Sequence, residues 1–157
     1  MKTISLIIIT LMSCSLFAAP GVQSTTEVKH VVKCVKYVDA EKIVACSGVK
    51  SSSALEHVVN CTENVLADNA IACMGVESKN HVRKVTECIE EVGIANGNAC
   101  TGVAGNLKNV KRCVDGVPSS AARACLGVTS SSEAKLVIDC VKKVGVDAAR
   151  ACGPTRL

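Results

Sequence analysis

The sequence predicts an all-α protein made of five disulfide-stapled helical hairpins of about 27 residues, stacked as a short α-solenoid. Three observations predict this fold class. Cysteine pairs with eleven residues between them recur at Cys34/Cys46, Cys61/Cys73, Cys88/Cys100, Cys113/Cys125 and Cys140/Cys152. The first cysteines follow one another at intervals of 27, 27, 25 and 27 residues, a period typical of stacked repeats. Apolar residues recur around each first cysteine with a helical period.

Residues 1–19 have the features of a secretory signal peptide. Lys2 supplies the positive start, Ile4 to Met12 form an apolar run, and small residues lead to Ala19. A bacterial lipoprotein signal with an acylated Cys14 is the alternative, which Met12 fits poorly. We therefore expect a secreted, extracellular protein, periplasmic if its source is bacterial, without stable membrane insertion after signal removal.

Ten cysteines remain when Cys14 is set aside, and they form five equal pairs. An even number of regularly spaced cysteines in an exported chain indicates a disulfide framework. Metal sites usually use close pairs such as CxxC, and the sequence contains none. Neither a metal nor another cofactor is expected.

Equivalent residues can be compared by numbering each unit from its first cysteine as position 0. Positions −3 and +4 are Val in every unit, and position +1 is apolar in four of the five. Position −1 is always polar, which breaks the alternation that a strand requires. Positions −3, 0, +1 and +4 share one helical face, so a first helix of about three turns is predicted in each unit despite its valines.

A short connector and a second, shorter helix should complete each unit. Serine runs at 51–53 and 130–132 offer N-caps for two of the first helices, with Ser53 and Glu56 as a possible capping box. Ala precedes the second cysteine in all five units, and Gly occupies position +14 in four. This Gly is suited to end the second helix in a left-handed conformation.

The spacing also predicts how the cysteines pair. Folding the two helices of a unit back on each other should bring its two cysteines level. The interval inside a unit is always twelve residues, whereas the intervals between units are 15, 15, 13 and 15. The predicted disulfides are Cys34–Cys46, Cys61–Cys73, Cys88–Cys100, Cys113–Cys125 and Cys140–Cys152.

Residues 20–157 are expected to form one domain of five units, at approximately 27–50, 51–77, 78–104, 105–129 and 130–157. The period and the helix pairs resemble α-solenoid arrays in general. The unit is shorter than tetratricopeptide and ankyrin repeats, whose signature residues are missing. No particular family is indicated.

The sequence contains no recognisable catalytic constellation, so an enzyme is not expected. A Gly-rich phosphate loop, an HExxH helix and a GxSxG elbow are all missing. His30 and His57 occupy the same position in consecutive units, but packed helices lie about 8–10 Å apart, so we interpret both as surface histidines. Glu90 and Glu91 are interpreted as part of a solvated helix face.

Asn60-Cys61-Thr62 matches the N-glycosylation pattern. Asn60 is therefore a candidate glycosylation site, provided that it is exposed and the source is eukaryotic. The middle residue of the motif is expected to be held in a disulfide.

Charge and aromatic content limit the classes of partner. After the signal, the net charge is +3 and Tyr37 is the single aromatic residue, which argues against nucleic-acid binding. The charge is uneven: residues 51–77 contain four acidic and no basic side chains, whereas residues 105–129 have a net charge of +3.

The leading hypothesis is a secreted, non-catalytic binding or interaction module with an unknown protein partner. Its constant positions are structural, while positions −1, +2 and +3 vary in charge. An extracellular carrier of a small apolar ligand is the first alternative, because the chain is rich in Val and Ala. A membrane-active or antimicrobial protein is less favoured, because the positive charge is small and aromatic anchors are missing.

Overall fold

The computed structural model describes residues 24–153, so the predicted signal peptide and Cys14 lie outside the described residues. Within this range each unit consists of an α-helix followed by a 3-10 helix, and no strand is present. The α-helices are α1 (Thr25–Tyr37), α2 (Ser52–Glu63), α3 (Lys79–Val92), α4 (Leu107–Asp115) and α5 (Ser131–Val144). The 3-10 helices are η1 (Ala40–Cys46), η2 (Ala67–Cys73), η3 (Ile94–Cys100), η4 (Ser119–Cys125) and η5 (Val146–Cys152).

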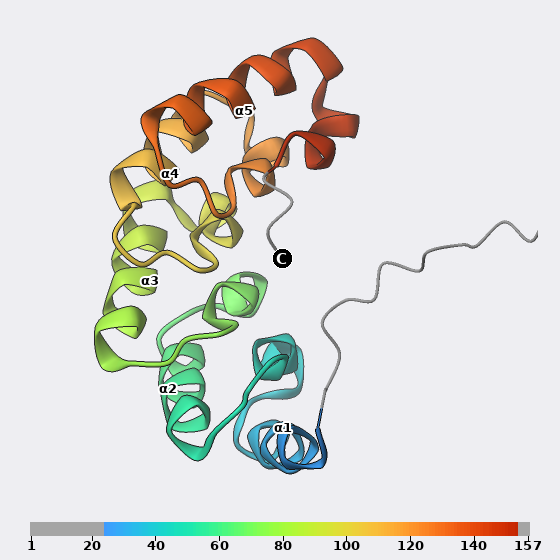
Figure 1. The fold of residues 1–157 in the computed structure, drawn as a ribbon, viewed down its shortest axis with the longest axis vertical. Helices are drawn as coiled ribbons and strands as arrows, with labels where there is room; N and C mark the ends of the chain where they lie inside the picture. Colours follow the sequence, from blue (N-terminus) through green and yellow to red (C-terminus); the bar gives the residue numbers. More distant parts are fainter. Residues whose placement is uncertain (1–23, 154–157) are drawn as a thin grey trace, which may run out of the picture.

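The two kinds of helix form two layers. Each α-helix contacts the next α-helix, and each 3-10 helix contacts the next 3-10 helix. Figure 1 shows the units following an arc from α1 to α5, with the α-helices along its outer side and the 3-10 helices along its inner side. We call these the outer and inner layers. In the part of the chain that the structure describes, element contacts join only consecutive units.

Serine N-caps begin four of the five α-helices. The hydroxyl groups of Ser24, Ser51, Ser78 and Ser130 each accept a hydrogen bond from the backbone amide three residues later. The predicted Ser53–Glu56 capping box is wrong, because Ser51 caps α2 by accepting from the Ala54 amide at 3.0 Å. Ser51 has the extended backbone that an N-cap needs (φ −147°, ψ 164°), and this start places the buried Leu55 within the helix.

Helix α4 differs from the others because its unit lacks two residues. It has nine residues, against 12 to 14 in the other α-helices. Its N-cap, Asn106, makes no capping bond, and its side-chain amide instead donates to the Val128 carbonyl of the same unit. The two-residue deletion therefore shortens the helix start and leaves the disulfide-closed part unchanged.

The second helix of each unit is a 3-10 helix seven residues long, a type that the sequence pattern does not specify. This tighter form has bonds between residues three apart and seldom extends beyond about four residues, so these helices are unusually long for their type. The predicted left-handed glycines are confirmed: Gly48 and Gly75 have φ values of +79° and +69°, and Gly102 and Gly127 behave alike. Gly93, which ends α3, also has a positive φ of +80°, which was not predicted.

Five disulfides join the two layers, one within each unit, with the pairing that the twelve-residue spacing predicts. Their Cα–Cα distances are 5.7 to 5.8 Å. This separation is within the range that a disulfide permits. The Ala residue before each second cysteine is buried in the first four units, at Ala45, Ala72, Ala99 and Ala124. A small side chain at this position lets the inner layer lie close to the outer layer.

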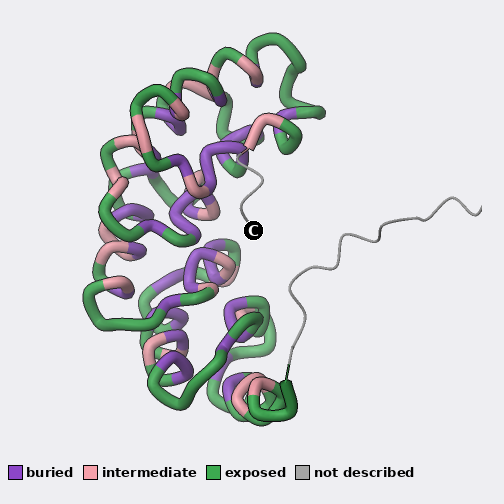
Figure 2. The backbone as a smooth tube through the Cα atoms, in the orientation of Figure 1, coloured by how far each residue is buried: buried purple, intermediate pink, exposed green. Residues whose placement is uncertain are grey.

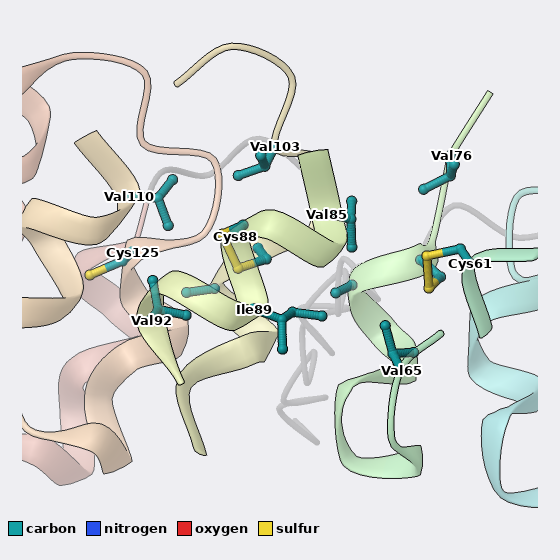
Figure 3. Packing of buried hydrophobic residues seen from close by; sticks show 14 of the residues in the cluster. Cys61, Val65, Val76, Val85, Cys88, Ile89, Val92, Val103, Val110 and Cys125 are labelled. Carbon is teal, nitrogen blue, oxygen red and sulfur yellow. A yellow bond between two sulfur atoms is a disulfide. The ribbon is translucent and has the colours of Figure 1, made fainter. Parts of the chain in front are cut away.

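The core runs between the layers along the whole arc (Figure 2). Its fully buried side chains include the valines at position +15, directly after the left-handed glycines: Val49, Val76, Val103 and Val128. Valines at position −3, such as Val85 and Val110, complete it beside the disulfides (Figure 3). The predicted apolar stripe is thus buried in the central units.

One position of the stripe is exposed in each end unit. Val35 at position +1 of the first unit is 43% exposed, and Val144 at position +4 of the last unit is 46% exposed. Equivalent residues in the third unit, Ile89 and Val92, are 8% and 7% exposed. The stripe is therefore covered partly by neighbouring units, which the end units lack on one side.

Candidate binding surfaces

The outer layer displays the charge-varying positions that the sequence singled out. Position +2 is exposed in all five units, with the residues Lys36, Glu63, Glu90, Asp115 and Lys142. Position −1 is exposed in four units and half-buried at Glu87, while position +3 is exposed except at Gly116. Glu90 and Glu91 are both exposed on α3, as expected of a solvated face.

A hollow of about 470 Å³ lies between α2 and α3, and we call it the outer hollow. It is lined by Glu56, His57, Asn60 and Asn64 of α2, and by Lys79, Val82, Arg83, Thr86 and Glu90 of α3. One of its four charged side chains, Arg83, is already paired within α3. Arg83 forms an ion pair with Glu87, and its second terminal nitrogen donates to Asn80 Oδ1 at 2.9 Å. The outer hollow is therefore a polar seam between helices.

The inner layer contains a second hollow, of about 250 Å³, which extends over η3, η4 and η5. We call it the inner hollow. It is lined by Ala95, Asn96, Asn98, Ser119, Ser120, Ala121, Ala122, Arg123, Ala124, Val146, Asp147, Ala149 and Arg150. Because three consecutive units contribute to it, the stacking of units creates a site that one unit by itself does not contain.

Two arginines at equivalent positions give the inner hollow its positive charge. Arg123 and Arg150 both occupy position +10, in the fourth and fifth units, and both are exposed. Within residues 24–153 neither guanidinium forms an ion pair, although Asp147 lines the same hollow. Guanidinium groups bind carboxylates through paired, charge-assisted hydrogen bonds. The two side chains are thus available to an external anionic group.

Two asparagines add acceptors to the same hollow. The Asn96 Oδ1 and Asn98 Oδ1 atoms are buried and have no hydrogen-bond partner among the described residues, while Asn96 Nδ2 donates to the Val92 carbonyl at 2.8 Å. A buried acceptor without a partner is costly, so each oxygen favours a small buried donor such as a water molecule. The inner hollow therefore presents the guanidinium donors of its two arginines, while the two asparagine oxygens lie beneath its surface.

Position +10 forms a graded row along the inner layer. From the first unit to the last it contains Val44, Ile71, Asn98, Arg123 and Arg150. Val44 is 40% exposed and Ile71 is half-buried, whereas both arginines are exposed. One end of the row is therefore apolar and the other basic. Sequence reasoning missed this row, because only the inner-layer geometry shows that position +10 points outward while the neighbouring positions +9 and +11 are mostly buried.

The three histidines do not form a metal centre. His30 and His57 are half-buried on α1 and α2, and His57 lines the outer hollow. No group of three or more His, Cys, Asp or Glu side chains within residues 24–153 is arranged to hold a metal ion. His81, in the first turn of α3, has a lowered pKa chiefly because burial disfavours its charged form.

The candidate glycosylation site lies on the outer layer. Asn60 is exposed on α2, while Cys61 is fully buried in its disulfide and Thr62 is 3% exposed. The motif lies in the last turn of α2, which ends at Glu63, and the Asn60 carbonyl accepts a hydrogen bond from the Asn64 side chain at 2.7 Å. In the folded protein the acceptor nitrogen is exposed, but the rest of the motif is inaccessible. Modification would therefore have to precede folding.

None of the helices within residues 24–153 has the length and apolar character needed to cross a membrane. Comparison with protein-family models, with curated proteins and with solved structures finds no significant match to the chain. Any functional conclusion therefore has to come from its own residues.

Proposed function

We propose that this disulfide-rich helical protein is a secreted, non-catalytic interaction module, and that its units act as a short α-solenoid presenting the inner layer to a protein partner. The observation that supports this most directly is the graded row at position +10. Repeat arrays commonly bind extended partners along a surface to which each unit contributes one or two side chains.

The residues of the row define the partner's chemistry. Arg123 and Arg150, which have no carboxylate partner within residues 24–153, favour acidic side chains. Val44 and Ile71, at the other end of the row, favour an apolar segment. The proposed partner is thus an extended segment that is acidic at one end and apolar at the other.

Secretion is part of the proposal. It is supported by the signal-like residues 1–19 and by five disulfides, which persist in oxidising compartments. The carrier alternative has less support, because both hollows contain charged and amide side chains and are open to solvent. A carrier would also release a stoichiometric lipid when the purified native protein is extracted and analysed by mass spectrometry.

The test compares two double variants with the same loss of charge. Arg123→Ala with Arg150→Ala removes the basic end of the inner row. Arg112→Ala with Lys142→Ala removes two exposed positive charges from the outer layer. Partners are captured from the fluid in which the protein is found, and their contacts are mapped by cross-linking and mass spectrometry.

We expect the inner-layer variant to lose the partner and the outer-layer variant to retain it. Cross-links in the wild type should fall on the 3-10 helices. Loss of the partner in the outer-layer variant alone would assign binding to the other surface. If the wild-type protein captured no specific partner, the interaction role itself would be wrong.

A further inference from the structure

The first unit leaves an apolar end face uncovered. Val28, Val32 and Val35 on α1 are 47%, 52% and 43% exposed, and Ile43 on η1 is 47% exposed. These residues occupy positions −6, −2, +1 and +9. The three valines recur at intervals of four and three residues, so they form one face of α1.

Equivalent positions in later units are covered. At position −6, Leu55, Val82 and Ala134 are at most 8% exposed and Leu107 is half-buried. At position +9, Ala70, Ala122 and Ala149 are at most 3% exposed, and all four later residues at position −2 are half-buried.

The preceding unit provides this cover. A Cβ built on Gly116 at position +3 of the fourth unit would lie 2.4 Å from Ile138 Cδ1, so the side chain at position −2 of the fifth unit packs directly there. The exposed face of α1 thus corresponds to the face by which the fifth unit packs against the fourth.

The last unit leaves the complementary face uncovered. Leu136 at position −4 is 68% exposed, and Val144 at position +4 is 46% exposed. Inside the array, position −4 of one unit and position −6 of the next border the same hollow, as His57 and Val82 do. In that register Leu136 of one molecule and Val28 of another would border the same hollow. The first and the last unit thus each expose large apolar residues at positions that a neighbouring unit covers inside the array.

We propose that a second copy of this chain is the partner of the end face, with the last unit of one molecule docked on the first unit of the next in the register of the internal units. Repeat arrays that remain monomeric usually have polar capping units, and this array has apolar residues at both ends. Because the two surfaces differ, the contact is heterologous and can continue into short open chains. It is independent of the partner binding proposed above, because that binding uses the inner layer.

Charge at the docked ends predicts how salt affects this contact. Asp139 and Lys29 would take the places of Asn60 and Arg83, which border one hollow, and would attract each other. Lys143 and Lys36 would take the places of Asn64 and Glu90 and would repel. Residues 27–50 and 130–157 each have a net charge of +2, so repulsion dominates. Added salt should therefore strengthen self-association, since it screens repulsion without weakening apolar contact.

The test uses one blocking variant for each end, measured by sedimentation velocity over a concentration series. Val32→Glu blocks the first face and Leu136→Glu blocks the last; both sites are exposed, so the fold should tolerate the change. Ala104→Glu, at an exposed position between the third and fourth units, adds the same charge away from both ends. Circular dichroism confirms that each variant is folded.

We expect the average mass of the wild type and of Ala104→Glu to rise with concentration, while each blocking variant by itself stays monomeric. A one-to-one mixture of the two blocking variants should form a dimer and nothing larger, because one intact face of each kind remains. A wild type that is monomeric throughout the concentration series would overturn the proposal. Dimers of Leu136→Glu alone, or of Val32→Glu alone, would also overturn it in favour of contacts between like ends.

Discussion

The buried side chain of Asn69 in η2 lies directly against the Cα of Gly97 in η3. A Cβ added to Gly97 would lie 2.5 Å from both Asn69 Cγ and Oδ1. Asn69 is only 1% exposed, so it has little room to withdraw. The second and third units can therefore approach each other closely in the inner layer, because Gly97 of the third unit has no side chain at this point.

Replacing Gly97 by Ala should destabilise the protein by about 1–3 kcal/mol, the usual cost of overpacking a core. Denaturant titration monitored by circular dichroism measures the change. Gly105→Ala is the matched control, because no atom lies within 4 Å of a Cβ added at this position and its φ is not positive. It should be neutral or slightly stabilising. Equal losses at both sites would mean that the Asn69–Gly97 contact does not limit the approach of the units.

Removing a central disulfide should cost more stability than removing the last one. Cys88 and Cys100 are fully buried between two neighbouring units, whereas Cys140 and Cys152 are half-buried in a unit with one neighbour. Each bridge should contribute about 3 kcal/mol by restricting the unfolded chain. The Cys88→Ala/Cys100→Ala variant should lose additional interface energy in denaturant titrations. Equal losses, in one sharp transition of unchanged slope, would indicate a single cooperative globule.

The disulfides should also differ in their rates of reduction. Cys140–Cys152 is the bridge whose cysteines are both partly exposed, while both cysteines of every other bridge are at most 1% exposed. Attack by an external thiolate requires access to sulfur, so this bridge should be reduced first. Differential alkylation and peptide mapping under mild reduction give the order. In strong denaturant the preference should disappear, because all five loops have the same length.

The N-cap of α2 can be tested with adjacent serines. Ser51→Ala should destabilise the protein by about 1 kcal/mol, because it removes the hydroxyl that accepts from the Ala54 amide. Ser53→Ala, inside the same helix and exposed, should have almost no effect. Thermal unfolding of the two variants beside the wild type measures the difference. A larger loss at Ser53 would restore the capping box expected from the sequence.

His81 should make stability depend on pH. Burial, the largest effect, lowers its pKa below 6.5; Glu77 raises the pKa and Lys84 lowers it by smaller amounts. The unfolded chain therefore binds this proton more readily than the folded protein. The stabilising contribution is complete above the ordinary histidine value of about 6.5 and is lost as the pH falls through the lowered folded value.

His81→Gln should accordingly show a smaller drop in the free energy of unfolding than the wild type between about pH 8 and pH 5. Urea titrations at several pH values in this range measure the free energy of unfolding. An unchanged dependence in His81→Gln would show that other groups cause the drop.

The sequence by itself determined the repeat and its framework. The invariant spacing of twelve residues predicted the five pairs, because a chain folded back on itself brings equidistant cysteines together. The valines at positions −3 and +4 identified the α-helices, since their period fits one helical face. The glycines at position +14 marked the left-handed ends. All of these features depend on interactions within one unit, which a local pattern can encode.

Only the tertiary structure decided how consecutive units meet. The 3-10 form of the second helices, the close approach of Gly97 to Asn69, and the outward direction of position +10 all depend on the inner layer, which no single unit forms. Val28 and Val35 look like ordinary core residues in the sequence, yet they are exposed because no earlier unit packs against the first one within the described residues. The pattern within a unit predicts which side chains are apolar and lie on the face that can be buried. Whether they are buried depends on which neighbour is present to cover them.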